Sequence, residues 1–283
     1  MKLLTVYAHP ADTITNCGGT LARHADAGDD ITALILTHGG RIHANRYAEE
    51  WRKEDRDESV VSADLQAIID HKKHELERAA EIVGIRNLVT LDHDDTMAAV
   101  HEEVIEQIAE TVAREQPDVV ICDYPKNPVM TMDAHTAASA MALAGVARAG
   151  FYLKNLDGRS ETAVKQVFLT SLQVTANDAL SHYGMRNDCF IDITPVVERK
   201  IAAMDCFASQ GYAGLFARKL IESNNGEMGR AAGVNFAEGF VRLHSETRAL
   251  LGVTDAARDA DPLTRHVGYS RLNLRGMFPV EAG

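Results

Sequence analysis

The stretch KLLTVYAHPADTITNCGGTLARH, residues 2–24, passes from a short apolar segment directly into a polar one. Residues 2–8 are apolar, include β-branched side chains and have the length of a strand. Residues 13–28 then follow the spacing of a helix and end at a glycine. His9 and Asp12 therefore lie where a strand passes into a helix, which is a common place for ligands in α/β proteins.

The same alternation of strands and helices continues to about residue 175. Further strands are predicted at 31–37, 87–92, 118–123 and 166–172, and helices at 64–85, 100–116 and 134–149. The run ITALILT (31–37) does not alternate between polar and apolar residues, as expected of a parallel strand that is covered on both faces. We therefore predict an α/β fold, a Rossmann-like parallel sheet with helices on both faces. Residues 38–60 are polar and read as a long connection.

The later part of the chain has a different pattern. FIDIT (190–194) is a short predicted strand, and Pro195 begins a helix that continues to about Phe207. Glycine-punctuated helical segments follow, which indicates a mostly helical C-terminal cap packed against the sheet. The expected organisation is an α/β domain over residues 1–207 with a helical appendage over residues 208–283 packed on the same domain.

The composition limits the classes of partner. With 46% hydrophobic residues among 283, the chain can bury a full core. A net charge of −12 argues against nucleic-acid and membrane surfaces as partners, and no apolar run approaches the ~20 residues that span a bilayer. The N-terminus does not resemble a signal peptide, and the four cysteines lack CxxC spacing. We expect a cytoplasmic protein that binds a small anionic metabolite and that could form a homo-oligomer.

Polar side chains follow several of the predicted strands. His9 and Asp12 follow the first strand, His38 follows the second, and His135 begins the helix after the fourth. Because the carboxyl ends of parallel strands meet at one edge of a sheet, these groups converge. Two imidazoles and a carboxylate with open positions form a plausible Zn²⁺ or Fe²⁺ site that acidifies water. From the residues alone, a purely structural role for His9 is equally open.

The pair Gly18–Gly19 offers a different interpretation. It could form an anion-binding turn at a helix N-terminus. However, GxGxxG is absent and no acidic residue ends the second strand, so the pattern disfavours dinucleotide binding.

The motif AHPADxxxxCGGTLA resembles the AHPDDExxxxGGTLA signature of the PIG-L/LmbE-like metal-dependent enzymes, most of which are N-deacetylases of amino sugars. The segments LTHGGR, KKHELERAAEIVGI and PDVVICDYPKNPVMTMDAHTAA are similar to later motifs of that family, in the same order. The resemblance covers about residues 1–145, and FIDITPVVERKIAAMDCFASQ is similar to a later strand and helix. It implies the fold and metal site of that family, with Zn²⁺ as the expected cofactor and Fe²⁺ or another divalent metal as alternatives.

The resemblance also assigns ligands. His9 and Asp12 match the first two metal ligands of the family, and His135 in the DAH triplet is similar to the third. The spacing of this last motif departs from the family, since Asp133 is one residue farther from the histidine, which leaves its role open. Asp123, at the end of the fourth strand, is a candidate to orient a ligand histidine.

Ala11 stands where the deacetylases have an aspartate that takes a proton from metal-bound water. Thr13 likewise replaces the usual acidic residue. One explanation is a deacetylase whose base has moved to His38, His43 or Asp133. The other is changed chemistry, because the 4-carboxy-2-hydroxymuconate (4-oxalomesaconate) hydratase branch has the same Asp-to-Ala replacement in an AHxAD motif. Those enzymes add water across a conjugated double bond.

Other residues are candidates for proton transfer and substrate binding. The hydratase branch has a glutamate after its second strand where this chain has GGRIH, so His43 is our preferred acid/base residue, with Glu49 or its neighbour as an alternative. The candidates for substrate binding are Arg41, Lys72, Asn127 and His182.

The leading prediction is a zinc-dependent hydratase acting on a small unsaturated (poly)carboxylic acid such as 4-carboxy-2-hydroxymuconate. The alternative is a zinc-dependent N-deacetylase, a C–N hydrolase, with a relocated base. The third reading is a metal or small-ligand binding protein without catalysis, and retention of all three ligands argues against it.

Overall fold

The computed structural model describes residues 1–42, 45–126, 133–156, 164–171 and 184–254. Its strands are β1 (Lys2–Tyr7), β2 (Asp30–Thr37), β3 (Asn87–His93), β4 (Val119–Asp123), β5 (Gln166–Thr170), β6 (Cys189–Asp192) and β7 (Ala237–Arg242). Its helices are α1 (Asp12–Asp26), α2 (Asn45–Trp51), α3 (Glu58–Val61), α4 (Leu65–Val83), α5 (Glu102–Glu115), α6 (Ala134–Leu156), α7 (Val197–Met204), α8 (Leu215–Leu220) and α9 (Gly226–Ala232). Shorter turns are η2 (Thr194–Val196), η3 (Ala208–Gln210) and the π-helical η4 (Ile221–Asn225).

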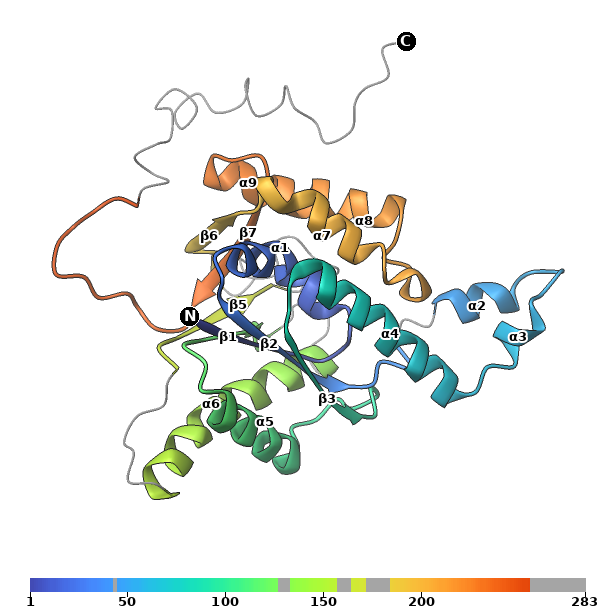
Figure 1. Cartoon of the computed structure of the whole chain (residues 1–283), viewed down its shortest axis with the longest axis horizontal. Coiled ribbons are helices and arrows are strands. Elements are labelled where there is room, and N and C mark those ends of the chain that lie inside the picture. Colours follow the sequence, from blue (N-terminus) through green and yellow to red (C-terminus); the bar gives the residue numbers. More distant parts are fainter. Residues whose placement is uncertain (43–44, 127–132, 157–163, 172–183, 255–283) are drawn as a thin grey trace, which may run out of the picture.

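The strands form a seven-stranded sheet with the order β3-β2-β1-β4-β5-β7-β6. Neighbouring strands from β3 to β5 are parallel, whereas β7 is antiparallel to both β5 and β6. Helices α1, α4 and α7 cover one face, and α5 and α6 cover the other (Figure 1). The predicted α/β sheet with helices on both faces is confirmed. No helix among the described residues is long and apolar enough to cross a membrane.

The buried core lies in two layers because the central strands are apolar on both sides. Leu3, Ile31 and Ile35 face α1 and α4, while Leu4 and Leu34 face α5 and α6. This two-sided burial is what the continuous apolar runs in the sequence predict for parallel strands.

Helix α4 shows how local signals set an element's limits. The Asp64 side chain accepts a hydrogen bond of 2.8 Å from Ala67 N and caps its first turn. Gly84 ends it in the left-handed conformation at a φ of 96°. The predicted helix over residues 64–85 therefore differs from the observed one only by the two caps and one further residue, Ile85.

Helix α1 is interrupted, and the interruption explains the glycine pair. Cys17 leaves helical geometry with a φ of −140°, so the helix starts again after it. The N–H groups of Gly19 and Thr20 donate to the carboxylate of Glu238 at 2.9 and 2.6 Å. The anion-binding turn that the glycine pair offers as an alternative interpretation thus exists at Gly19 and Thr20, and the anion is the chain's own carboxylate.

Strand β7 supplies this carboxylate and was not predicted. It belongs to the expected C-terminal appendage, yet it lies inside the sheet between β5 and β6. Glu238 is fully buried and pairs with Lys200 of α7 at 2.6 Å. The polar connection over residues 38–60 also differs from expectation, since it contains the short helices α2 and α3.

Candidate metal centre

The candidate centre lies where the order of the sheet reverses. Strand β1 has β2 on one side and β4 on the other, so the segments that follow β1 and β4 lead to opposite faces. Ligands in open α/β sheets bind at such a switch point. His9 and Asp12 follow β1, Asp123 ends β4, and His135 lies in the first turn of α6.

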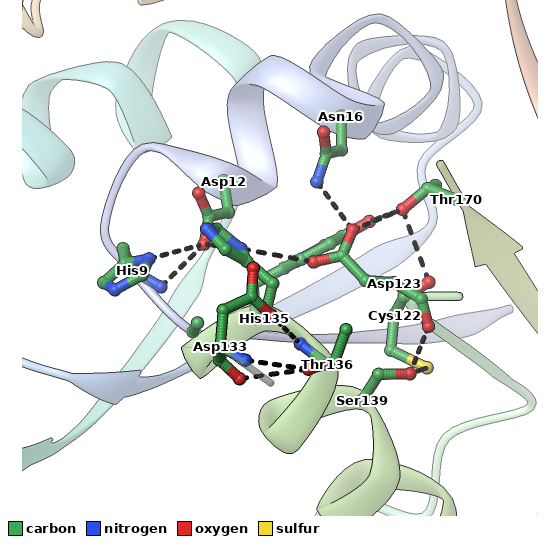
Figure 2. A network of polar contacts seen from close by, with 12 residues as sticks. His9, Asp12, Asn16, Cys122, Asp123, Asp133, His135, Thr136, Ser139 and Thr170 are labelled. Carbon is green, nitrogen blue, oxygen red and sulfur yellow. Dashed lines mark hydrogen bonds and ion pairs between the residues drawn. The ribbon is translucent and has the colours of Figure 1, made fainter. Parts of the chain in front are cut away.

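His9, Asp12 and His135 are brought together as predicted (Figure 2). Asp12 Oδ2 lies 3.3 Å from His9 Nδ1 and 3.4 Å from His135 Nδ1. The same oxygen accepts a hydrogen bond of 2.7 Å from the backbone N–H of His9, which fixes the carboxylate in the turn before α1. The two imidazole rings are 4.7 Å apart, edge to face. All three residues are buried.

These distances fit a shared divalent cation. Zinc bonds of about 2.0–2.1 Å place two tetrahedral ligand atoms about 3.3–3.4 Å apart, which matches the separations at Asp12 Oδ2. Among the described residues, His135 Nδ1 and Asp123 Oδ2 are buried without a hydrogen-bond partner, 3.6 Å from each other. Two imidazoles and a carboxylate are the donor set that zinc and ferrous iron accept.

The electrostatics of the cluster point the same way. Burial favours neutral Asp12, but the charge of His135 and the close contacts of both histidine side chains outweigh it and hold the pKa of Asp12 below its usual range. Burial lowers the pKa of His135, yet Asp12 and Asp123 outweigh this and raise that pKa well above its ordinary value. Burial raises the pKa of Asp123. The carboxylates therefore stabilise positive charge between them.

One carboxylate oxygen of Asp123, Oδ1, is hydrogen-bonded to neutral side chains. This oxygen accepts hydrogen bonds from Asn16 Nδ2 at 2.9 Å and from Thr170 Oγ1 at 3.0 Å (Figure 2). The Tyr7 hydroxyl lies 3.0 Å from the same Thr170 oxygen. This arrangement turns Asp123 Oδ2 toward His135 Nδ1, the same nitrogen that faces Asp12. A carboxylate that orients a ligand histidine binds the other ring nitrogen, so Asp123 instead adds a negative charge beside the candidate ligands.

Ala11 lies beside this cluster and offers it no proton-transfer group. Its side chain is 2% exposed and packs in the apolar core cluster, while its carbonyl accepts the N–H groups of Ile14 and Thr15. Thr13 is fully buried, with its hydroxyl 3.4 Å from that of Thr5. At both positions where the resemblance predicts acids, the chain has buried side chains that cannot serve as a base near neutral pH.

A second group of titratable residues lies along the same edge, at the ends of β2 and β3. Nδ1 of His38 lies 3.1 Å from Asp95 Oδ1 and accepts a hydrogen bond of 2.9 Å from Gly40 N–H. Asp94 Oδ2 is 4.0 Å from His38 Nε2 and pairs with Arg41 Nε at 2.8 Å. The sequence did not lead us to Asp94 and Asp95. They follow β3 directly, as His38 follows β2, so their position after a strand is the signal that could have identified them.

Lys72 has a different environment from the one its predicted role needs. It is fully buried, and its ammonium donates to the backbone carbonyls of Gly39 and Ile42. Burial lowers the pKa of Lys72 to about 8, against the opposing charges of Asp95 and other carboxylates. The side chain therefore holds the loop after β2, which carries His38 and Arg41.

The remaining predicted residues are distributed as follows. Asp133 caps α6, since its Oδ1 accepts a hydrogen bond of 2.8 Å from Thr136 N. Glu49 is exposed on α2, whereas its neighbour Glu50 is buried, pairs with Lys53 and accepts a hydrogen bond from the backbone N–H of Asp57, the residue that caps α3. His43, Asn127 and His182 lie outside the described residues.

Comparison with known proteins gives a consistent picture. The model of the PIG-L family, described as GlcNAc-PI de-N-acetylase, matches residues 4–146. The diacetylchitobiose deacetylase of Thermococcus kodakarensis is 27% identical over 210 residues, which is 74% of this chain and 70% of that protein. The 4-oxalmesaconate hydratase of Pseudomonas putida is 26% identical over 238 residues, 84% of this chain and 85% of that protein.

A solved structure supports the fold. The 4-carboxy-2-hydroxymuconate hydratase of Pseudomonas putida superposes with a TM-score of 0.69 at 22% identity, covering 89% of this chain and 99% of that chain.

Proposed function

Since this chain belongs to the PIG-L family, whose members among its relatives include a hydratase and a deacetylase, we propose that it is a metal-dependent hydratase of a small unsaturated carboxylic acid. The observation that carries this proposal is Ala11, which leaves the ligand cluster intact and removes the base that amide hydrolysis needs. The alignment with the hydratase covers 84% of this chain, against 74% for the deacetylase, and this also supports the proposal.

In this proposal His9, Asp12 and His135 would hold the cation, and Asp123 would add a negative charge beside it. When bound there, a divalent cation supplies Lewis-acid polarisation of a substrate oxygen. Hydration breaks the π bond of one C=C: the oxygen of water bonds to one carbon, and a proton is delivered to the other.

His38 is the described residue best placed to carry that proton. When neutral, its Nδ1 accepts the Gly40 N–H, which leaves the proton on Nε2 at the edge of the sheet. When protonated, Nδ1 faces the buried carboxylate of Asp95. Arg41, half-exposed and fixed by Asp94, is the proposed partner of a substrate carboxylate. His43 keeps its proposed role as an acid/base residue.

The test pairs metal analysis with two activity assays. Purified protein should contain about one divalent ion per chain and should bleach the absorbance of conjugated dienoic or enol acids, with 4-carboxy-2-hydroxymuconate as the first substrate. It should release no amine from N-acetylated amino sugars. His135→Ala should lose both metal and activity, whereas His38→Gln should keep the metal and lose about 10²–10⁴ in rate.

The second candidate function is N-deacetylation with a relocated base, which the similarity to the diacetylchitobiose deacetylase favours. Amine release by the wild-type protein would establish it and refute the hydratase. Amine release by Ala11→Asp alone would show a deacetylase framework that lacks its base. Metal binding without either activity would leave the chain as a binding protein.

A further inference from the structure

An apolar cavity lies at the edge of the sheet opposite the candidate metal centre. Its volume is about 340 Å³, and its walls are side chains from α1 and the sheet, including Leu3, Ile121, Phe168, Ile191 and Phe240. Several wall residues lie at or near the amino-terminal ends of β1, β4, β5 and β6. The cavity is therefore separate from the residues assigned to catalysis.

The segment after β7, residues 243–254, is the second observation. We call it the C-terminal arm. Leu250 is 82% exposed, Leu251 is 105% exposed and Val253 is 59% exposed. Figure 1 shows this segment leaving the sheet near the N-terminus and arcing outward at the side of the molecule. Adjacent leucines that are this exposed usually mark a contact with another surface.

One residue connects the arm to the cavity. Gln166 lines the cavity, and its side-chain amide makes two hydrogen bonds to the backbone of His244. Its Nε2 donates to the carbonyl oxygen of His244 at 2.8 Å, and its Oε1 accepts from the N–H of His244 at 3.0 Å. Beyond this point Glu246 pairs with Arg242 at 2.6 Å and with Arg248 at 2.8 Å. The arm is thus fixed at the rim of the cavity, while its leucines lie beyond the fixed part.

We propose that the arm of one copy places Leu250 and Leu251 in the cavity of a second copy, and that the second copy does the same in return. Such a reciprocal exchange uses the same two surfaces twice and closes a twofold dimer. Two observations favour a second copy as the occupant. The ion pairs of Glu246 fix the base of the arm. The rest of the arm then arcs outward at the side of its own body. A cavity of roughly 150 Å³ holds a benzene molecule, so 340 Å³ has room for two leucine-sized groups.

The first test measures mass in solution. By light scattering after size exclusion, the wild-type chain should be a dimer or a multiple of one. Leu250→Asp combined with Leu251→Asp should shift it to single chains, with a dimer dissociation constant raised at least about tenfold. Leu215→Asp is the matched control, because Leu215 is 89% exposed on α8 and away from the arm. A monomeric wild type, or a dimer that the double variant leaves intact, would overturn the proposal.

The second test uses Cys189, which lines the cavity and is less buried than the other three cysteines. Leu251→Cys treated with a short bismaleimide should give covalent dimers. The product should disappear when Cys189→Ser is added, and Leu215→Cys should give none. A Cys189-dependent link within one chain, which keeps the mass of a monomer, would show that the arm fills its own cavity and would refute exchange. Neither test depends on catalytic activity.

Discussion

Replacing Glu238 by glutamine keeps the size of the side chain and removes its charge. In the wild type this carboxylate accepts hydrogen bonds from Gly19 N, Thr20 N and Lys200 Nζ at 2.6–2.9 Å, and both members of the ion pair are buried. In Glu238→Gln the ammonium of Lys200 keeps only neutral partners, Thr15 O and Asn225 Oδ1. Removing one member of a buried ion pair costs about 3–5 kcal/mol in unfolding free energy.

At roughly 2–4 °C per kcal/mol for a chain of this size, the melting temperature should fall on the order of 10 °C. Thermal unfolding followed by far-UV circular dichroism, with the metal content of all samples held equal, measures it. Glu77→Gln is the matched control, because it makes the same change in an exposed side chain, whose ion-pair contact is with the exposed His74, and should leave the melting temperature nearly unchanged.

A second variant tests the cause. Adding Lys200→Met to Glu238→Gln removes the unpaired charge, so the double variant should be more stable than Glu238→Gln alone. A fall of less than about 2 °C in Glu238→Gln, or further destabilisation on adding Lys200→Met, would refute the reasoning.

Three further outcomes are expected. Asp123→Asn removes a negative charge 3.6 Å from His135 Nδ1 and should lower zinc affinity about 10–100-fold, measured by competition with a chromophoric chelator; unchanged affinity would contradict this role of Asp123. The pKa of Lys72 is lowered from 10.5 to about 8 in the folded chain. Between these pH values the unfolded chain binds more protons than the folded chain, so the free energy of unfolding rises with pH. Urea unfolding should show this rise in the wild type, and the rise should be absent in Lys72→Met. Gly145→Ala should lower the free energy of unfolding in urea by about 1–3 kcal/mol, since a Cβ there would lie 2.5 Å from Ile108 Cγ2. Gly252→Ala is the control, because a Cβ at that position meets open space and should change this free energy little.

Much of the fold could be predicted because parallel strands carry a strong local signal. β2 has no alternation of polar and apolar residues and is buried along almost its whole length, and β1 leads directly into a polar turn. β7 has no such signal, because the run AEGFVR contains a glycine and a glutamate that becomes fully buried. Its place in the sheet depends on Lys200 and on α1, which are distant in sequence. Tertiary contacts therefore override local propensity there.

The candidate site shows the same division. The positions of His9, Asp12 and His135 follow from strand ends and from the resemblance, and the structure brings them together. The role of Lys72 could not be read from the sequence, because a lysine with helical spacing on α4 looks like a solvated residue. Its burial follows from the path of the loop after β2, whose carbonyls it binds.

The bond between Glu238 and the interrupted helix α1 also has a consequence for synthesis. Gly19 and its carboxylate partner are 219 residues apart, so the turn that follows the metal-ligand segment cannot be completed until the ribosome has made nearly all of the described chain. Closing so long a loop is slow, and the unfinished edge of β5 stays exposed in the meantime. The turn after residue 17 therefore cannot form its bonds to Glu238 before β7 has been made, and we expect the incomplete sheet to be a target for chaperones during synthesis.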